Sequence, residues 1–303
     1  MAAPDEDSGV QSAVRQLFLA GGGYATTAAL LQLLTRQQLD VQVRRGTLIR
    51  VWHGVYAPAE PDYFGRLVSL DKYLGLPAVA CMGTAAALYG FDTEGTTAVH
   101  ILDPGRRIRP APGLVVHQRL GAPLQRVRSR LATSPAWTAV EIARTLRRPR
   151  ALATLDAALH TGSCMPADLA EAAAEQRGRR GIVAVRELLA LADGRAESPM
   201  ETEARLAMHD HDVPRPELQF LIHGRWESWR VDFAWPEYQV AAEYESVDWH
   251  AGREAMLKDK ARFAGIQHAR WTVIPITVTD VRVHPERLAE RVREHLWRAA
   301  AAS

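Results

Sequence analysis

The sequence predicts an α+β protein built from several domains, and three observations indicate this class. Its 303 residues are enough for two or three domains of ordinary size. Hydrophobic residues make up 47% and charged residues 24%, a balance that is typical of globular chains and excludes wholesale disorder or a collagen-like fibre. Helical and β-type patterns also alternate along the chain, and six of the eight tryptophans lie in its last third.

The amino-terminal region predicts three helices followed by a β-hairpin. Threonines at 26, 27 and 35 are natural helix caps, and His53-Gly54 is a plausible tight turn between two β-type runs. This order of elements is that of a winged helix-turn-helix, whose third helix enters the major groove of DNA. We expect this domain over residues 12–60, with its elements at 12–20, 24–34, 35–46, 48–52 and 55–56.

Polar side chains of the third helix and of the hairpin are candidates for contacting DNA. Glutamine amides form hydrogen bonds with base edges, and arginines bind phosphates as well as bases. The alternative is a small helical domain whose polar residues are only solvated. The candidate DNA-binding residues are Gln37, Gln38, Gln42, Arg44, Arg45 and Arg50, with His53 also on the hairpin.

Charge is unevenly distributed along the chain. The formal net charge is only +2, but residues 105–130 contain seven arginines and no acidic residue. Three prolines and two glycines make residues 103–113 a loop. Its arginines are either solvated or contact an anion.

Cysteine content and apolar runs bear on the cellular setting. Two cysteines, Cys81 and Cys164, provide neither a disulfide framework nor a zinc pattern. The acidic, polar start is unlike a signal peptide, and no apolar run is long enough to cross a membrane. We expect a cytoplasmic protein with no membrane contact.

The middle region, residues 61–193, predicts a mixed α/β part followed by helices. Strands are expected at 99–102 and 114–117, after a helical stretch at 84–88. The Ala- and Leu-rich part that follows contains Pro149, which we expect to separate helices. Those helices are expected at residues 137–146, 152–160, 167–176 and 183–191, and the polar segment 193–198 marks a domain boundary.

The carboxyl-terminal region, residues 198–300, predicts a helix, three strands, a helix, a strand and a helix. Ser198 is a natural N-cap, and Glu201 is then placed to cap the same helix. The expected strands are 217–223, 229–235, 238–245 and 271–276, where Pro275 indicates either an edge strand or an early end of the strand. The later helices are expected at 249–264, bearing Lys258, Lys260 and Arg262, and at 285–297.

A two-residue loop at Pro236-Glu237 would place Asp232 and Glu243 on one face of the hairpin as diagonal neighbours. Carboxylates at that spacing can converge on Mg²⁺, and the small Ala234 and Ala241 leave room for an ion or a phosphate. The alternative is a solvated polar face on which Arg230 pairs with Glu243.

Three motifs occur in order in this region: SPMETEARL, VDFAWPEYQVAAEYE and WTVIPIT, with the basic helix before the last. In this arrangement they resemble the PD-(D/E)XK nuclease superfamily. More narrowly, the region is similar to the domain related to very-short-patch repair endonucleases. The resemblance implies a restriction-endonuclease-like α/β fold, in which Asp232, Glu243 and Glu201 hold Mg²⁺ or Mn²⁺. The sequence departs from the superfamily pattern at two positions: Glu245 stands where the pattern has lysine, and Pro275 stands where arginine is common.

By this resemblance, the expected activity is metal-dependent hydrolysis of DNA phosphodiester bonds. The ion would activate water and neutralise the phosphate. Glu201 or Glu245 would orient that water or hold a second ion, and a cation would come from Lys258 or Lys260. His250 is either a leaving-group contact or a plain surface residue.

The amino-terminal part, with TAAALYGF and TSPAWTAVEIARTL, resembles AbiEi-type antitoxin regulators of abortive-infection systems. That resemblance implies an alternative function: a DNA-binding regulator or antitoxin whose nuclease-like domain is inactive, with a toxin as a further partner.

Overall fold

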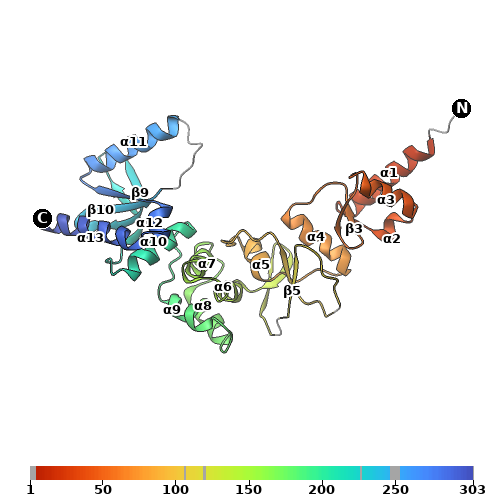
Figure 1. Ribbon diagram of the computed structural model, residues 1–303, viewed down its shortest axis with the longest axis horizontal. Helices are drawn as coiled ribbons and strands as arrows, with labels where there is room; N and C mark the ends of the chain where they lie inside the picture. The colour runs from red at the N-terminus through yellow and green to blue at the C-terminus, as the bar shows by residue number, and fades with distance from the viewer. Residues whose placement is uncertain (1–4, 106, 119–120, 226, 246–252, 303) are drawn as a thin grey trace. The chain divides into compact units, whose positions relative to one another are not determined.

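The computed structural model describes residues 5–105, 107–118, 121–225, 227–245 and 253–302, with the side chains of 5–8, 253–259 and 302 excepted. The chain divides into two compact units: residues 1–88 with 94–134, and residues 89–93 with 135–303. Each unit contains both helices and strands (Figure 1), which confirms the mixed α/β, multidomain class.

The first unit begins with three helices followed by a hairpin, in the order that the sequence predicts, but the helix predicted at 24–34 extends only over Thr27–Leu30, and Ala25–Thr26 forms a short strand instead. Thr26 caps the second helix and Thr35 the third, each accepting a backbone N–H at 3.2 Å. The three short strands form one antiparallel sheet in the order β1-β3-β2. The elements are α1 (Asp5–Ala20), β1 (Ala25–Thr26), α2 (Thr27–Leu30), α3 (Arg36–Arg44), β2 (Ile49–Trp52) and β3 (Val55–Ala57).

Apolar side chains from all three helices meet under this sheet. Phe18 from α1, Leu30 from α2 and Leu39 from α3 are buried together with Tyr56 of β3. Burial of such side chains contributes roughly 1.5–3 kcal/mol each to the free energy of folding. This core fixes how α3 lies against α1.

The rest of the first unit contains two elements that the sequence did not predict, α4 and the β6–β7 hairpin. That hairpin turns at Arg128 and Ser129, whose φ angles are +46° and +66°. Because neither residue is glycine or asparagine, the usual signal for a tight turn is missing. The elements are α4 (Tyr63–Leu74), α5 (Met82–Tyr89), β4 (Val99–Leu102), β5 (Leu114–His117), β6 (Leu124–Val127) and β7 (Arg130–Thr133). The predicted strands at 99–102 and 114–117 are confirmed, and they pair in parallel.

The second unit opens with four helices close to the predicted positions. Pro149 does not separate helices as expected but lies in the first turn of α7, where proline is tolerated. Residues 193–198 lie within this unit, where the helix that follows them is joined to α7 by an ion pair of 2.5 Å between Arg205 and Asp156. The helices are α6 (Pro135–Ala143), α7 (Arg148–His160), α8 (Pro166–Glu175), α9 (Ile182–Leu189) and α10 (Pro199–Asp210).

A four-stranded sheet in the order β11-β10-β9-β8 follows α10 (Figure 1). Helices α10, α12 and α13 contribute to the apolar core on one face, with Phe233 and Ala242, whereas Ile266 of α11 packs with Ala234 and Ala241. As predicted from Pro275, β11 is an edge strand. The elements are β8 (Glu217–His223), β9 (Ser228–Trp235), β10 (Val240–Tyr244), α11 (Arg253–His268), β11 (Thr272–Ile276), α12 (Val278–Arg282) and α13 (Pro285–Ala302).

The register of the β9–β10 hairpin differs by two residues from the prediction. Trp235 pairs with Val240 instead of Tyr238, because Pro236–Tyr238 forms a 3₁₀ turn that ends at Gln239 with φ +51°. A shift of two residues keeps every side chain on its predicted face. Asp232 and Glu243 therefore lie directly opposite each other and are not diagonal neighbours as predicted. They follow Phe233 and Ala242, the last paired residues of the two strands.

No helix in the described part of the chain combines the length and apolar character that a membrane span requires.

Candidate functional site

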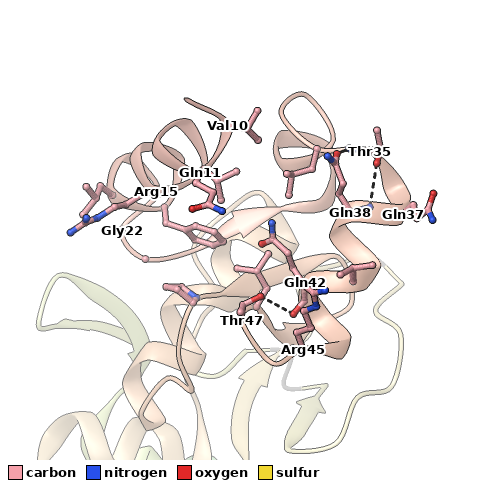
Figure 2. A pocket seen from close by; sticks show the side chains of 18 residues that line it. Val10, Gln11, Arg15, Gly22, Thr35, Gln37, Gln38, Gln42, Arg45 and Thr47 are labelled. Carbon is pink, nitrogen blue, oxygen red and sulfur yellow. Dashed lines mark hydrogen bonds between the residues drawn. The ribbon is translucent and has the colours of Figure 1, made fainter. Parts of the chain in front are cut away.

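A hollow of about 1300 Å³ lies beside α3, between this helix and α1 (Figure 2). Val10, Val14 and Phe18 of α1 form part of its apolar floor. Gln11 and Arg15, also from α1, line it as polar residues. None of the 18 lining residues is acidic. The described lining of the hollow therefore offers amide and guanidinium donors to an anion and contains no competing carboxylate.

Four of the six predicted DNA-binding residues line this hollow: Gln37, Gln38, Gln42 and Arg45. Helical spacing explains why three of them lie together, because residues 38, 42 and 45 are three or four positions apart and so share one face of α3. Leu39 points the other way into the core and is 1% exposed.

Two of these glutamines also stabilise the local structure. The Gln38 side chain accepts the Thr35 backbone N–H at 2.8 Å, which completes a capping box at the start of α3. The backbone carbonyl of Gln42 accepts the Thr47 hydroxyl at 3.0 Å (Figure 2). This capping role of Gln38 is additional to the DNA contact predicted for it.

The remaining two predicted DNA-binding residues do not line the hollow. The Arg44 Nε donates to the Asp40 carbonyl in the same helix at 3.4 Å. Arg50 lies over the Tyr56 ring, with its guanidinium carbon 5.6 Å from the ring centre. Both residues are exposed, so their side chains remain accessible to a ligand.

In the second unit, the predicted carboxylates of α10 and the sheet approach one another through a glutamine. Gln219 of β8 donates its side-chain N–H to Glu201 at 2.9 Å and to Asp232 at 3.4 Å. Gln219 has φ +52° in the middle of its strand, a conformation that is costly for a residue with a side chain. Gln219 was not among the predicted site residues, since a strand pattern carries no signal for such a conformation.

Burial raises the pKa of Asp232 to about 6. The nearby charges of Glu201 and Glu243 act in the same direction, whereas hydrogen bonds from the Tyr244 N–H (2.8 Å) and from Gln219 lower the pKa. A carboxyl group in this environment keeps its proton to a higher pH than an ordinary aspartate does, because burial and nearby negative charge disfavour its ionised form.

Glu243 is already paired with a cation from α11. The Arg262 guanidinium donates to both carboxylate oxygens of Glu243, and it also donates to the Arg230 carbonyl at 2.6 Å. The predicted pair between Arg230 and Glu243 is therefore wrong, and Arg230 instead bonds Glu197 at 2.7 Å. The space expected beside Ala234 and Ala241 is also absent, because both are fully buried where α11 packs on the sheet.

The Glu201 carboxylate does not accept the N–H of the N-cap residue, which is the bond that its position in the helix predicts. The Glu201 backbone N–H does bond the Ser198 hydroxyl at 3.1 Å, as expected of an N-cap. The Glu201 carboxylate, however, accepts the Glu197 N–H at 2.9 Å as well as Gln219.

The other predicted catalytic residues do not join this group in the described structure. Glu245 and Lys260 are exposed, and the Glu245 N–H donates to the Ile276 carbonyl at 2.8 Å. His250 and the side chain of Lys258 lie outside the described residues. Within the described ranges, no group of three or more His, Cys, Asp or Glu side chains is arranged to hold a metal ion.

Comparison with known proteins identifies one matching domain family and two similar proteins. Residues 78–191 match the family described as the AbiEi antitoxin C-terminal domain. Uncharacterized protein MT2308 and Uncharacterized protein Rv2248, from two strains of Mycobacterium tuberculosis, are each 66% identical to the chain over 270 residues. These residues cover 89% of the chain and 100% of each relative.

The chain belongs to the family of these two mycobacterial proteins. The antitoxin-domain match supports the AbiEi-type resemblance, since the motifs TAAALYGF and TSPAWTAVEIARTL both lie within the matched residues. The match ends at residue 191, before the carboxylates of α10 and the sheet.

Proposed function

We propose that the chain is a DNA-binding regulator of the AbiEi antitoxin type, which reads DNA with a winged helix-turn-helix over residues 12–60. The observation that carries this proposal is the hollow beside α3, where Gln37, Gln42 and Arg45 meet and no described lining residue is acidic. Amides and guanidinium groups on an exposed helix are the groups that read base edges and bind phosphates. The order of helices, sheet and hairpin supports the same interpretation.

The antitoxin-domain match at residues 78–191 supports the regulatory half of the proposal. In this interpretation DNA is one partner and a toxin protein is the other. The sheet of the second unit then acts as a folded platform and not as a catalyst, because Arg262 already neutralises Glu243.

The proposal is tested by replacing Arg44 and Arg45 with alanine in the full chain. The probe is a 30-base-pair duplex selected from a randomised pool by the wild-type protein. Each lost phosphate contact lowers the slope of log K against log salt by about 0.9, so the double variant should lose up to about 1.8. A matched control replaces two exposed arginines of the second unit, Arg177 and Arg287, with alanine.

Weaker binding and a flatter salt dependence in the α3 variant alone would support the proposal. Equal binding by the wild type and the Arg44→Ala, Arg45→Ala variant would contradict the role given to α3. Failure to select any duplex would contradict DNA binding altogether.

A second candidate function is the metal-dependent endonuclease, favoured by one observation: Gln219 links Glu201 to Asp232, and Glu243 lies on the adjacent strand. The donor set fits Mg²⁺ or Mn²⁺ poorly, however, because both oxygens of Glu243 already accept bonds from Arg262. Plasmid DNA with either ion, treated with wild type, Asp232→Ala and Glu243→Ala, separates the two functions. Cleavage that both variants lose would establish the nuclease, whereas no cleavage, or equal cleavage by all three, would remove it.

A further inference from the structure

The arginine-rich loop of the first unit is folded back onto α4. The Arg66 guanidinium, in α4, donates to the Pro112 carbonyl at 3.1 Å and lies 4.9 Å from the centre of the Trp52 ring. The Trp52 indole N–H in turn donates to the Arg66 carbonyl at 2.9 Å. Gly113, at φ +73°, lets the loop pass so close that a Cβ there would lie 2.6 Å from the guanidinium. The loop is therefore held in place and is not simply solvated.

This anchoring brings Arg109 to the turn of the β2–β3 hairpin. The Arg109 backbone N–H donates to the Tyr73 hydroxyl at 3.3 Å, and its guanidinium contacts Nε2 of His53. These two residues are 56 positions apart in the sequence, so the contact depends on the fold of the whole unit.

Arg109, His53 and Lys72 line a pocket of about 380 Å³. All three side chains are exposed, and none of the nine residues that line the pocket is acidic. Basic side chains that meet at a pocket without a carboxylate raise the local positive potential, which attracts an anion. An arginine also has five N–H donors, and contact with His53 does not use them all.

We propose that His53, Lys72 and Arg109 form a phosphate-binding pocket, which takes a phosphate group of the DNA backbone beside the reading helix. The ligand follows from chemistry, since guanidinium and ammonium groups together bind phosphate oxygens through charge-assisted hydrogen bonds. This inference rests on the proposed function. It adds that Arg109, which lies in the antitoxin-matched region and outside the helix-turn-helix, belongs to the DNA interface.

The test replaces Lys72 and Arg109 with alanine in the full chain and measures binding to a 30-base-pair duplex of mixed sequence across a range of salt. Phosphate contacts are independent of sequence, so this probe suffices. Loss of two contacts should lower the salt slope by up to about 1.8 and weaken binding at low salt at least tenfold. Arg107→Ala is the matched control, because Arg107 is an exposed arginine of the same loop that does not line the pocket.

An unchanged slope in the pocket variant, with Arg44→Ala and Arg45→Ala still weakening binding, would overturn the pocket and leave the proposed function standing. Absence of duplex binding by the wild type would remove both. The pocket would serve free phosphate instead if sodium phosphate, at constant ionic strength, shifted the NMR signals of His53 while the pocket variant bound DNA normally. A melting temperature equal to that of the wild type shows that the variant is folded.

Discussion

The buried carboxylates of the second unit and the two hollows of the first unit differ in how their charges are paired. In the second unit, buried carboxylates are paired with arginines: Glu141 with Arg144 and Arg179, and Glu203 with Arg150 and Arg282. In the first unit, the hollow beside α3 and the pocket at the hairpin turn are lined by basic and amide side chains, with no acidic residue among them. Charges that are paired within a fold are occupied by their partners, whereas basic side chains left without an internal counter-ion are available to an external anion.

The carboxylates near the sheet show why this difference bears on function. Glu243 would be the natural ligand for an ion, but Arg262 supplies its positive charge from α11. The like-charge repulsion that favours a metal at Asp232 and Glu243 is thereby reduced by the protein itself. The α3 surface has no such internal partner among the residues that line its hollow.

The largest expected effect is on stability and comes from Glu203→Ala. Burial alone raises the pKa of Glu203, but hydrogen bonds and charge from Arg282, with Arg150 and Arg147, bring it below its ordinary value. Removing this carboxylate leaves those arginines without their counter-charge, at a cost of about 2–4 kcal/mol. Urea denaturation at pH 7 measures the loss, and Glu175→Ala, at an exposed site, is the control. Equal losses in the two variants would contradict the pairing account.

A somewhat smaller effect is expected from Asp232→Asn, and it depends on pH. The pKa of Asp232 in the folded state is about 6, above its ordinary value of 3.8, so the fold favours the protonated form. The wild type should therefore lose about 2 kcal/mol as pH rises from 4 to above 6, and the asparagine variant should not. Urea denaturation at pH 4.5 and pH 8 measures this, with Glu245→Gln as the exposed control. Parallel profiles for wild type and Asp232→Asn would show that Asp232 titrates normally.

The smallest expected stability effect comes from Arg262→Ala, because this side chain is one-third exposed. Loss of its bonds to Glu243 should cost about 1–2 kcal/mol at pH 7. Arg262→Lys should recover part of that loss, since it keeps the charge without the paired donors. If both variants matched the wild type, Glu243 would be free for another partner, and the endonuclease interpretation would gain ground.

Local patterns predicted most elements but not their pairing. The bounds of β4, β5 and β8 agree with the sequence analysis, because alternation and flanking turn residues mark them. The β9–β10 register was wrong by two residues, since the left-handed conformation of Gln239 has no sequence signal. Contacts between distant segments were also missed, such as Arg262 on Glu243 and Arg109 on His53, because they arise only when helices and loops pack.

The comparison between the units is tested most directly by amide hydrogen exchange of the full chain, with and without bound duplex DNA. The account predicts slower exchange on DNA addition in α3, in the β2–β3 hairpin and in residues 107–113. It predicts no change in β8, β9 and β10. Protection confined to these strands, with none in α3 or the hairpin, would contradict it and would direct attention back to the carboxylates.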